Sequence, residues 1–413
     1  MDTSAAPQPV RALKIPRWEF IALCAALMAL NSLAIDIMLP ALQQIGASLG
    51  VENENHRQYV IPVYILGFGL AQLFFGPLSD RFGRRGPLLA GMAVYVAAAA
   101  AAAVAPTFGT LLACRLVQGI GAAATRVIAV SIVRDTFEGR RMAEVMSLIF
   151  MVFMAIPVVA PGLGQIIMLF ASWHFIFLAM ALGALLFTLW VALRLPETLH
   201  PEYRRPLTVQ AVVGGFVAVL TDRVALCYAL ASTFAFAAMF GFINSSQQIY
   251  VGLYGVGEWF PVIFACVAGL IAVSNFVNAR LVGRIGMRRL SQGALVMLLA
   301  ISLLWLGLSL RGPIPLFLFI AIFSAAMVPF AMLGSNFNAL AMEPLGALAG
   351  TASSVLGFMQ TFGGGLLGTA IGQAYDGTVT PLAVGFCLVS ACALVTVAIA
   401  ERGRMFEPHN PRV

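Results

Sequence analysis

The chain has 413 residues, of which 61% are hydrophobic and 10% are charged, and its formal net charge is +7. A soluble domain cannot bury this much apolar surface, so the composition predicts that lipid surrounds most of the chain. The apolar runs do not alternate with polar residues, which excludes an outer-membrane barrel and favours membrane-spanning helices, whose backbone groups are satisfied within each segment. The expected fold class is an all-α membrane protein.

Hydropathy predicts twelve transmembrane helices, each close to the roughly 20 residues that a bilayer requires. In chain order they cover 18–40, 58–79, 86–106, 108–133, 143–170, 173–194, 223–250, 258–281, 290–310, 313–336, 348–373 and 380–400. The fifth and eleventh runs are long and interrupted by glycine or proline, so kinked or broken helices are expected there.

A repeated loop sequence indicates that the twelve helices form two pseudo-symmetric six-helix halves. Four residues of the first copy recur in the second at one constant offset of about half the chain: Leu78, Arg81, Gly83 and Arg85 match Leu281, Arg284, Gly286 and Arg288. The second copy has Gly283 where the first has Asp80. The longest polar connection lies between the halves, so we expect an N-terminal bundle at 1–194, a cytoplasmic linker at 195–222 and a C-terminal bundle at 223–413.

The basic residues predict the topology. They gather in the connections of one side, at 11–17, 81–85, 134–141, 194–223, 280–289 and 402–412. The other side has only Arg57 and Arg311, so both termini are expected in the cytoplasm. The net charge thus follows from topology, and no nucleic-acid partner is expected. The six cysteines lie inside apolar runs without the spacing of metal ligands, so neither a metal nor a cofactor is predicted.

Three charged residues fall at membrane depth, where such groups are usually functional. Asp36 is in the first predicted span, and Arg115, at similar depth, and Arg126 are in the fourth. A carboxylate near an arginine can bind and release a proton, so Asp36 and Arg115 are candidates for proton coupling. Alternatively, Asp36 caps a helix end before Pro40, Arg115 binds backbone carbonyls, and Arg126 extends towards the cytoplasmic interface.

The segment Gly76–Arg85 resembles the loop signature of the major facilitator superfamily, between its second and third helices. Arg115-x-x-Gln118-Gly119 is similar to the fourth-helix signature of its proton-linked members. Pro157, Pro161 and Gly164 resemble the antiporter motif of the fifth helix, with Ala160 and Gln165 departing from it. That departure weakens the assignment to antiporters.

The first helix narrows the resemblance to one branch of the superfamily. Asp36 followed by Met38-Leu39-Pro40-Ala41-Leu42, with Val133-Arg134-Asp135 after the fourth span, is similar to the Bcr/CflA (bicyclomycin/chloramphenicol resistance) branch of twelve-span drug:proton antiporters. This resemblance implies a conformational latch formed by residues of the signature loop: Gly76, Asp80, Arg81, Gly83, Arg84 and Arg85. Alternatively, the arginines serve only as topology anchors.

Substrate sites in such transporters lie near the midplane between the halves. Six polar or charged residues at suitable depth are candidate substrate contacts: Asn31, Tyr64, Arg126, Asn244, Gln247 and Gln360. Each amide could equally hold two helices together.

The function expected from the sequence is proton-coupled efflux of small, partly hydrophobic compounds across a bacterial inner membrane. The protein is expected to act as a monomer, by alternating access, and not as an enzyme. Its predicted partners are the substrate, protons and the lipid bilayer. The alternative is a proton-coupled transporter of one metabolite, such as a sugar, an amino acid or an organic anion.

Overall fold

The computed structural model describes residues 15–137, 139–204 and 209–407. This part of the chain contains 12 helical segments that are long and apolar enough to cross a membrane. The predicted all-α membrane fold is therefore confirmed. Arg11, Lys14, Arg205 and Arg412, which entered the topology argument, lie outside the described residues.

The first six spans use the helices up to residue 194. They comprise α1 (Arg17–Asp36) with η1 (Leu39–Ala41) and α2 (Leu42–Ser48), α3 (Glu54–Arg57) with α4 (Val60–Phe82), α5 (Arg85–Ala102), α6 (Phe108–Thr136), α7 (Gly139–Phe170) and α8 (His174–Arg194). The short η2 (Pro201–Tyr203) and α9 (Val209–Thr221) follow within the predicted linker.

The last six spans use the helices from residue 223 onward. They comprise α10 (Arg223–Gln247) with η3 (Gln248–Leu253), η4 (Gly257–Trp259) with α11 (Phe260–Ile285), α12 (Met287–Ser309), α13 (Leu316–Met342) with η5 (Glu343–Leu348), α14 (Ala349–Phe358) with η6 (Met359–Gly363) and α15 (Gly364–Gln373), and α16 (Thr380–Ala400).

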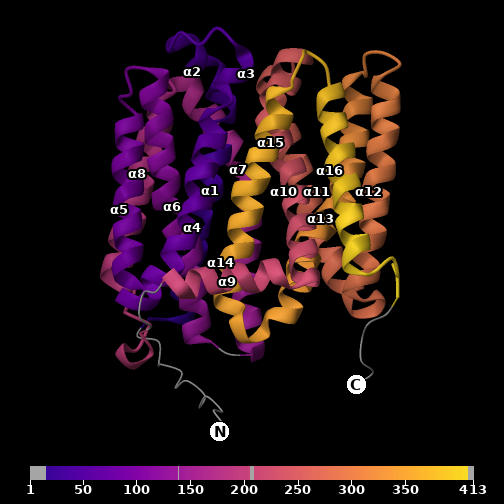
Figure 1. Ribbon diagram of the computed structural model, residues 1–413. Helices are drawn as coiled ribbons and strands as arrows, with labels where there is room; N and C mark the ends of the chain where they lie inside the picture. The colour runs from indigo at the N-terminus through magenta and orange to yellow at the C-terminus, as the bar shows by residue number, and fades with distance from the viewer. Residues whose placement is uncertain (1–14, 138, 205–208, 408–413) are drawn as a thin grey trace.

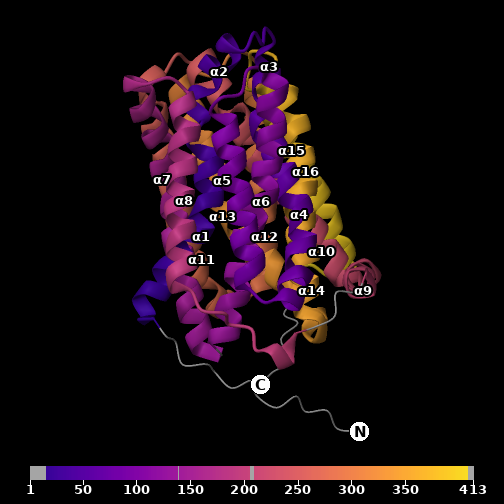
Figure 2. The same cartoon turned by 90° about the vertical axis from the view of Figure 1, so that its left-hand side faces the viewer.

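The spans stand side by side in one bundle, with α1, α4, α5, α6 and α8 on one side and α10, α12, α13 and α16 on the other (Figure 1). We call the end where α1 begins and α16 finishes the terminal end, and the end that carries α2 and α3 the far end. The helix α9 lies across the bundle, at the terminal end (Figures 1 and 2).

Close helix approach in the first six spans depends on small residues. A Cβ on Gly119 of α6 would lie 2.1 Å from the carbonyl oxygen of Tyr64 on α4, so only glycine permits this crossing. At the terminal end, Arg194 of α8 donates to both carboxylate oxygens of Glu19 on α1 at 2.6 Å. Such a two-pronged bond ties the first and sixth spans together.

The two interrupted runs differ from each other. The eleventh contains a π-helical turn, η6, between α14 and α15, and the backbone stays helical on both sides of it. The fifth, α7, is a single helix that contains Pro157 and Pro161. At this π-helical turn, Gln72 of α4 donates to the Thr361 hydroxyl of η6 at 3.2 Å, a polar contact between the two sets of spans.

Candidate functional site

Arg115 on α6 is a fully buried cation held by backbone carbonyls. Its Nε donates to the carbonyl oxygen of Val60 on α4 at 3.1 Å, and its Nη2 donates to that of Ala34 on α1 at 3.0 Å. Its Nη1 donates to Oε1 of Gln118 at 2.7 Å. Neutral dipoles from two neighbouring helices thus surround the positive charge. This contact is the alternative given above, in which Arg115 binds backbone carbonyls.

An aromatic ring completes the surroundings of Arg115. The guanidinium carbon lies 4.3 Å from the ring centroid of Tyr64, within the range of a cation–π contact. The Tyr64 hydroxyl in turn donates to Oδ1 of Asn31 on α1 at 2.9 Å. Asn31 and Tyr64, two of the predicted substrate contacts, therefore bond to each other.

Asp36 is the last residue of α1 and is 4% exposed. The Ser32 hydroxyl, one turn earlier, donates to its Oδ2 at 3.1 Å. None of the ion pairs among the described residues includes Asp36, so it does not pair with Arg115. The two groups are nevertheless close along α1, because Arg115 binds the carbonyl of Ala34, two residues before Asp36.

The predicted antiporter motif lies against the end of α1. A Cβ on Gly164 of α7 would fall 1.9 Å from the carbonyl oxygen of Ile37, so this contact requires glycine. Ile37 directly follows Asp36. Gly164 therefore brings the fifth span within backbone contact of the segment that carries the buried carboxylate.

Arg126 and Gln360 differ in how their polar groups are satisfied. Arg126 is half-buried on α6, and no hydrogen bond or ion pair joins it to another described residue. Gln360 of η6 donates to the Ser232 hydroxyl of α10 at 2.8 Å. Arg126 thus lacks a polar partner among the described residues, whereas Gln360 links two neighbouring helices.

Carboxamides join the two sets of spans at the far end. The side-chain amide of Asn55 on α3 donates to the carbonyl oxygens of Gln373 and Tyr375 at 3.0 and 2.9 Å. The Gln248 side chain donates to Oδ1 of Asn55 at 2.6 Å, and the Gln373 side chain donates to the backbone carbonyl oxygen of Asn55 at 2.6 Å. Asn55 is therefore the centre of a hydrogen-bonded seam that joins the two sets of spans at this end of the bundle.

The remaining predicted contacts lie just inside this seam. Gln58, preceding α4, donates to Oε1 of Gln247 on α10 at 3.4 Å. Asn244 is one helical turn before Gln247 and is 1% exposed, yet neither of its side-chain polar atoms has a partner in the described part of the chain. The six predicted substrate residues therefore fall into separate groups, and their contacts do not bring them together around one point.

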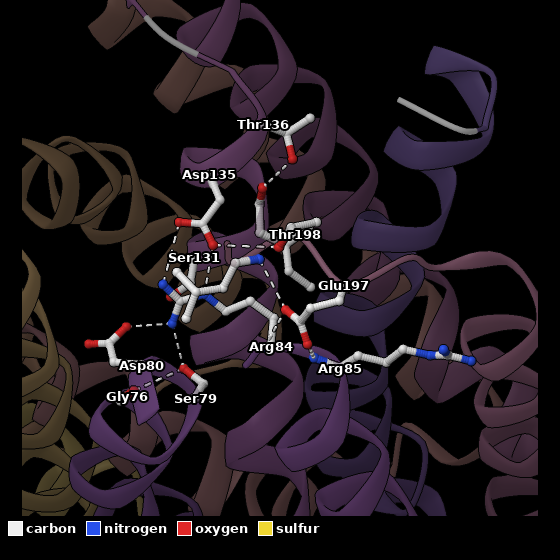
Figure 3. Close-up of polar contacts among 12 residues, drawn as sticks. Gly76, Ser79, Asp80, Arg84, Arg85, Ser131, Asp135, Thr136, Glu197 and Thr198 are labelled. Carbon is white, nitrogen blue, oxygen red and sulfur yellow. Dashed lines mark hydrogen bonds and ion pairs between the residues drawn. The ribbon is translucent and has the colours of Figure 1, made fainter. Parts of the chain in front are cut away.

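The signature loop at the terminal end turns at a glycine. Gly83 has φ +90°, and a Cβ there would lie 2.4 Å from Oε2 of Glu197. The same carboxylate accepts from the backbone N–H groups of Arg84 and Arg85 at 2.8 and 3.2 Å, at the first turn of α5 (Figure 3). A negative side chain in this position is favoured by the helix dipole.

Arg84 is the centre of the charged cluster that the signature loop forms (Figure 3). Its Nη1 donates to Oδ1 of Asp80 at 2.5 Å and to the Ser79 hydroxyl at 2.8 Å, and its Nε donates to Oδ2 of Asp135 on α6 at 2.7 Å. The side chain is only 3% exposed. Burial would lower the pKa of Arg84, but the hydrogen bonds and charges of Asp135 and Asp80 outweigh it and raise that pKa.

The other predicted latch residues have different surroundings. Arg85 donates through Nη2 to the carbonyl oxygen of Ala192 on α8. Arg81 is exposed, with its guanidinium carbon 5.5 Å from the ring centroid of Phe82. A Cβ on Gly76 would lie 3.1 Å from the Ser354 hydroxyl of α14, so this part of α4 faces the eleventh span.

Sequence reasoning assigned no latch role to Asp135 and Glu197, although both belong to the cluster around Arg84. Asp135 stands beside Arg134 at the end of a span, and Glu197 follows Pro196 at the start of the linker. Acidic residues are common at such membrane boundaries, so neither position suggested a particular contact. Their separation from Arg84 in the sequence hid the contact. Asn55 and Gln373 of the far-end seam were missed for the same reason.

The second loop copy forms a smaller cluster in the last six spans. Arg288 donates through Nη2 to Oε2 of Glu343 at 2.9 Å and lies 3.1 Å from Oε1 of Glu401. The Tyr228 hydroxyl donates to the same oxygen of Glu401 at 2.6 Å. Gly283 has open space around it, and Gly286 has φ +88°.

The described residues contain no group of three or more His, Cys, Asp and Glu side chains that could hold a metal ion. All six cysteines are free thiols.

The arrangement matches a known family of membrane transporters. Residues 21–369 match the model of the Major Facilitator Superfamily. The chain belongs to this superfamily. It is therefore a multi-pass inner-membrane protein of a family whose members bind small-molecule substrates and are generally not enzymes.

Relatives of known name place the chain in a branch of the superfamily. The bicyclomycin resistance protein homolog of Haemophilus influenzae is 31% identical over 382 residues, which cover 92% of this chain and 94% of the relative. The multidrug resistance protein MdtL of Escherichia coli is 30% identical over 387 residues, covering 92% and 96%. The predicted resemblance to the Bcr/CflA-like branch is therefore confirmed.

Solved structures of distant sequence share the fold. A D-xylose–proton symporter superposes with a TM-score of 0.70 at 15% identity and covers 95% of this chain and 98% of that one. The human organic anion transporter MFSD10 gives 0.62 at 19% identity, covering 94% and 100%. At these identities the likeness concerns the fold alone.

Proposed function

We propose that the protein exports small, partly hydrophobic compounds across the inner membrane in exchange for protons, by alternating access. The names of the bicyclomycin resistance homolog and MdtL support drug efflux. In this proposal both termini are cytoplasmic, and the protein acts as a monomer. Its two moving units are residues 1–194 and 223–413, connected by 195–222. The terminal end is then the cytoplasmic end, and the far end faces outward.

The observation that carries proton exchange is the state of Asp36. It is buried, accepts one side-chain hydrogen bond, and has no ion-pair partner among the described residues. Burial without an ion-pair partner disfavours the charged form of a carboxyl, so its protonation depends on its access to water. Opening the bundle to one side or the other would alter its contact with water, so each half-cycle could load or release a proton.

Arg115 supports this role without pairing directly. Its contact with the Ala34 carbonyl places a fixed positive charge beside the last turn of α1. Gly164 lets α7 press on the same segment. A rearrangement between α1, α6 and α7 would therefore change the electrostatic surroundings of Asp36, which is the coupling that an exchanger needs.

The far-end seam supports alternating access. The bonds of Asn55 to Gln373, Tyr375 and Gln248 join the two proposed units and would have to break for the outward-open state. We assign this structure to the outward-closed part of the cycle.

The test is Asp36→Asn in purified protein reconstituted into vesicles with an imposed pH gradient. We expect gradient-driven uphill export to be abolished, while downhill substrate exchange continues because the fold and the membrane insertion are kept. Glu52→Gln, which neutralises an exposed far-end carboxylate, is the matched control. Uphill export by Asp36→Asn at the wild-type rate would reject proton exchange through this residue.

A second candidate function is transport of one organic anion or strongly polar metabolite. The observation that favours it is the half-buried guanidinium of Arg126, which has no bonded partner in the described part of the chain. Arg126→Ala should then reduce export of anionic compounds most and of neutral lipophilic compounds least. Arg126→Lys should restore simple charge attraction but not two-pronged recognition.

Export of several compounds of differing charge, normalised to protein level, measures this effect. An equal loss for every compound would assign Arg126 a structural role. Unchanged export of all of them would remove it from the substrate path.

A further inference from the structure

The connection between the sixth and seventh spans contains a helix whose place relative to the membrane is fixed by its neighbour. α9 ends at Thr221, and α10, the seventh span, begins at Arg223. Between them Asp222 caps α10, with Oδ1 accepting from the backbone N–H of Ala225 at 2.8 Å. The end of α9 therefore lies where the chain enters the bilayer.

The direction of α9 keeps its whole length at that level. The helix crosses the terminal end of the bundle in Figure 1, and Figure 2 shows it nearly end-on at the outer edge, beside α14 and α10. Its 13 residues are too few to span a bilayer, which needs about 20. It thus lies along the membrane boundary rather than through it.

The two faces of α9 have different surroundings. Val219 is fully buried, and the Phe216 ring meets that of Phe358 on α14 edge-on, with centroids 5.8 Å apart. On the adjoining face Val213, Val217 and Leu220 are 50%, 51% and 52% exposed. Their spacing of four and three residues aligns them on one side of the helix.

These three side chains are as exposed as those on the outer surface of the spans. Leu189 of α8, for comparison, is 50% exposed. Residues 209–221 contain no charged residue, while the exposed Arg204 and Arg223 lie on either side of the helix. An apolar stretch flanked by arginines complements the acyl boundary and the anionic headgroups of a lipid leaflet.

We propose that α9 is a lipid-binding helix. The face formed by Val213, Val217 and Leu220 is inserted into the leaflet at the terminal end, at the boundary between headgroups and acyl chains. Two observations favour lipid over a protein partner: α9 continues directly into a span, and it lies at the outer edge of the bundle. Because Phe216 packs on Phe358, the inserted helix also fixes the start of the eleventh span relative to the leaflet.

The test measures the depth of position 217 in the full-length protein in vesicles. The exposed Cys266 and Cys392 are replaced by alanine, and Val217→Cys is labelled with bimane. Vesicles of phosphatidylcholine and phosphatidylglycerol with brominated acyl chains report lipid contact, and acrylamide reports water contact. Glu202→Cys, at an exposed site of the same connection, is the aqueous control, and Leu189→Cys is the lipid control.

We expect brominated lipid to quench position 217 at least about twofold more strongly than position 202, with the opposite order for acrylamide. Val217 is half exposed, so the cysteine variant is expected to fold, and fluorescence-detected gel filtration verifies this. Quenching of position 217 equal to that of position 202 by both agents would overturn the proposal, and would leave the apolar face for a protein partner. The result does not depend on proton exchange, so it stands or fails separately from the proposed function.

Discussion

The two loop copies use the same backbone turn but pair their arginines differently. Gly83 and Gly286 have φ +90° and +88°, so the turn itself is repeated in both sets of spans. In the first copy Arg84 is 3% exposed and binds Asp80 within the loop segment and Asp135 on a neighbouring span. The two loops therefore share the geometry of the backbone turn but differ in their ion pairs.

The second copy relies on acids at the ends of other helices. Arg288 is 16% exposed and pairs with Glu343 after α13 and Glu401 after α16, the first of which is 50% exposed. Loss of the acid at the Gly283 position therefore did not leave the second loop without carboxylates. Arg288 matches Arg85 of the first copy, and Met287 stands where the first copy has Arg84, so the second loop lacks the central arginine as well as the acid. The comparison teaches that the first cluster is buried, whereas the second forms around a different arginine and is partly solvated.

The largest expected difference comes from removing the two arginines. Arg84→Ala leaves the buried carboxylate of Asp135 without its partner and should cost about 3–5 kcal/mol of stability. Arg288→Ala should cost about 1–3 kcal/mol, because Glu401 keeps the bond from Tyr228 and Glu343 is half solvated. Thermal unfolding of the purified variants in detergent measures both.

Arg81→Ala, which removes an exposed arginine of the first loop, is the control for that pair. Equal shifts for Arg84→Ala and Arg288→Ala would show that burial does not separate the two clusters.

A smaller difference is expected from the two turn glycines. Gly83→Ala and Gly286→Ala both force a side chain into a backbone region that is nearly exclusive to glycine, at about 1–3 kcal/mol each. Gly83→Ala should be the worse, because its Cβ would also meet the Glu197 carboxylate, whereas Gly286 has open space. The melting temperatures of the two variants give the comparison, and a larger loss for Gly286→Ala would contradict it.

The smallest effect on stability is expected at Asp80, where the second copy has Gly283. Asp80 is 35% exposed and Arg84 retains Asp135, so Asp80→Asn should cost only about 1 kcal/mol. If the first loop acts as a latch, transport should nevertheless fall far more for Asp80→Asn than for Gly283→Ala. Initial export rates in vesicles test this, and equally mild losses would reduce the loop to a topology anchor.

The fold could be predicted from the sequence because a lipid environment permits few kinds of secondary structure, and the family could be predicted from the loop and helix motifs. Each apolar run had to be a helix that satisfies its own backbone, and the distribution of arginines gave a topology. Asp36, Arg115 and Arg126 stood out because charges are costly at membrane depth. The eleventh span, expected to be kinked or broken, is a continuous helix with a π-helical turn, and α7 is one helix that contains Pro157 and Pro161.

The partners of the charged groups could not be read in the same way. The sequence indicated that Asp36 and Arg115 lie at similar depth, but Arg115 binds carbonyls and Asp36 binds Ser32. Glu197 reaches the signature loop, and Asn55 reaches Gln373, across more than a hundred residues. The apolar content of 209–221 was visible within the predicted linker, but its course across the terminal end of the bundle was not.

By itself the sequence determined what each segment needs: helices where lipid is the solvent, glycine where φ is positive or backbones touch, and cations at the ends of the spans. The tertiary structure decided which group meets each of those needs. A buried charge can be satisfied by a carboxylate, a carbonyl, an amide or an aromatic ring, and local sequence does not choose among them. The packing of α1, α4 and α6 assigned carbonyls to Arg115. Asp80 is local to Arg84, but only the approach of α6 and of the segment after α8 added Asp135 and Glu197.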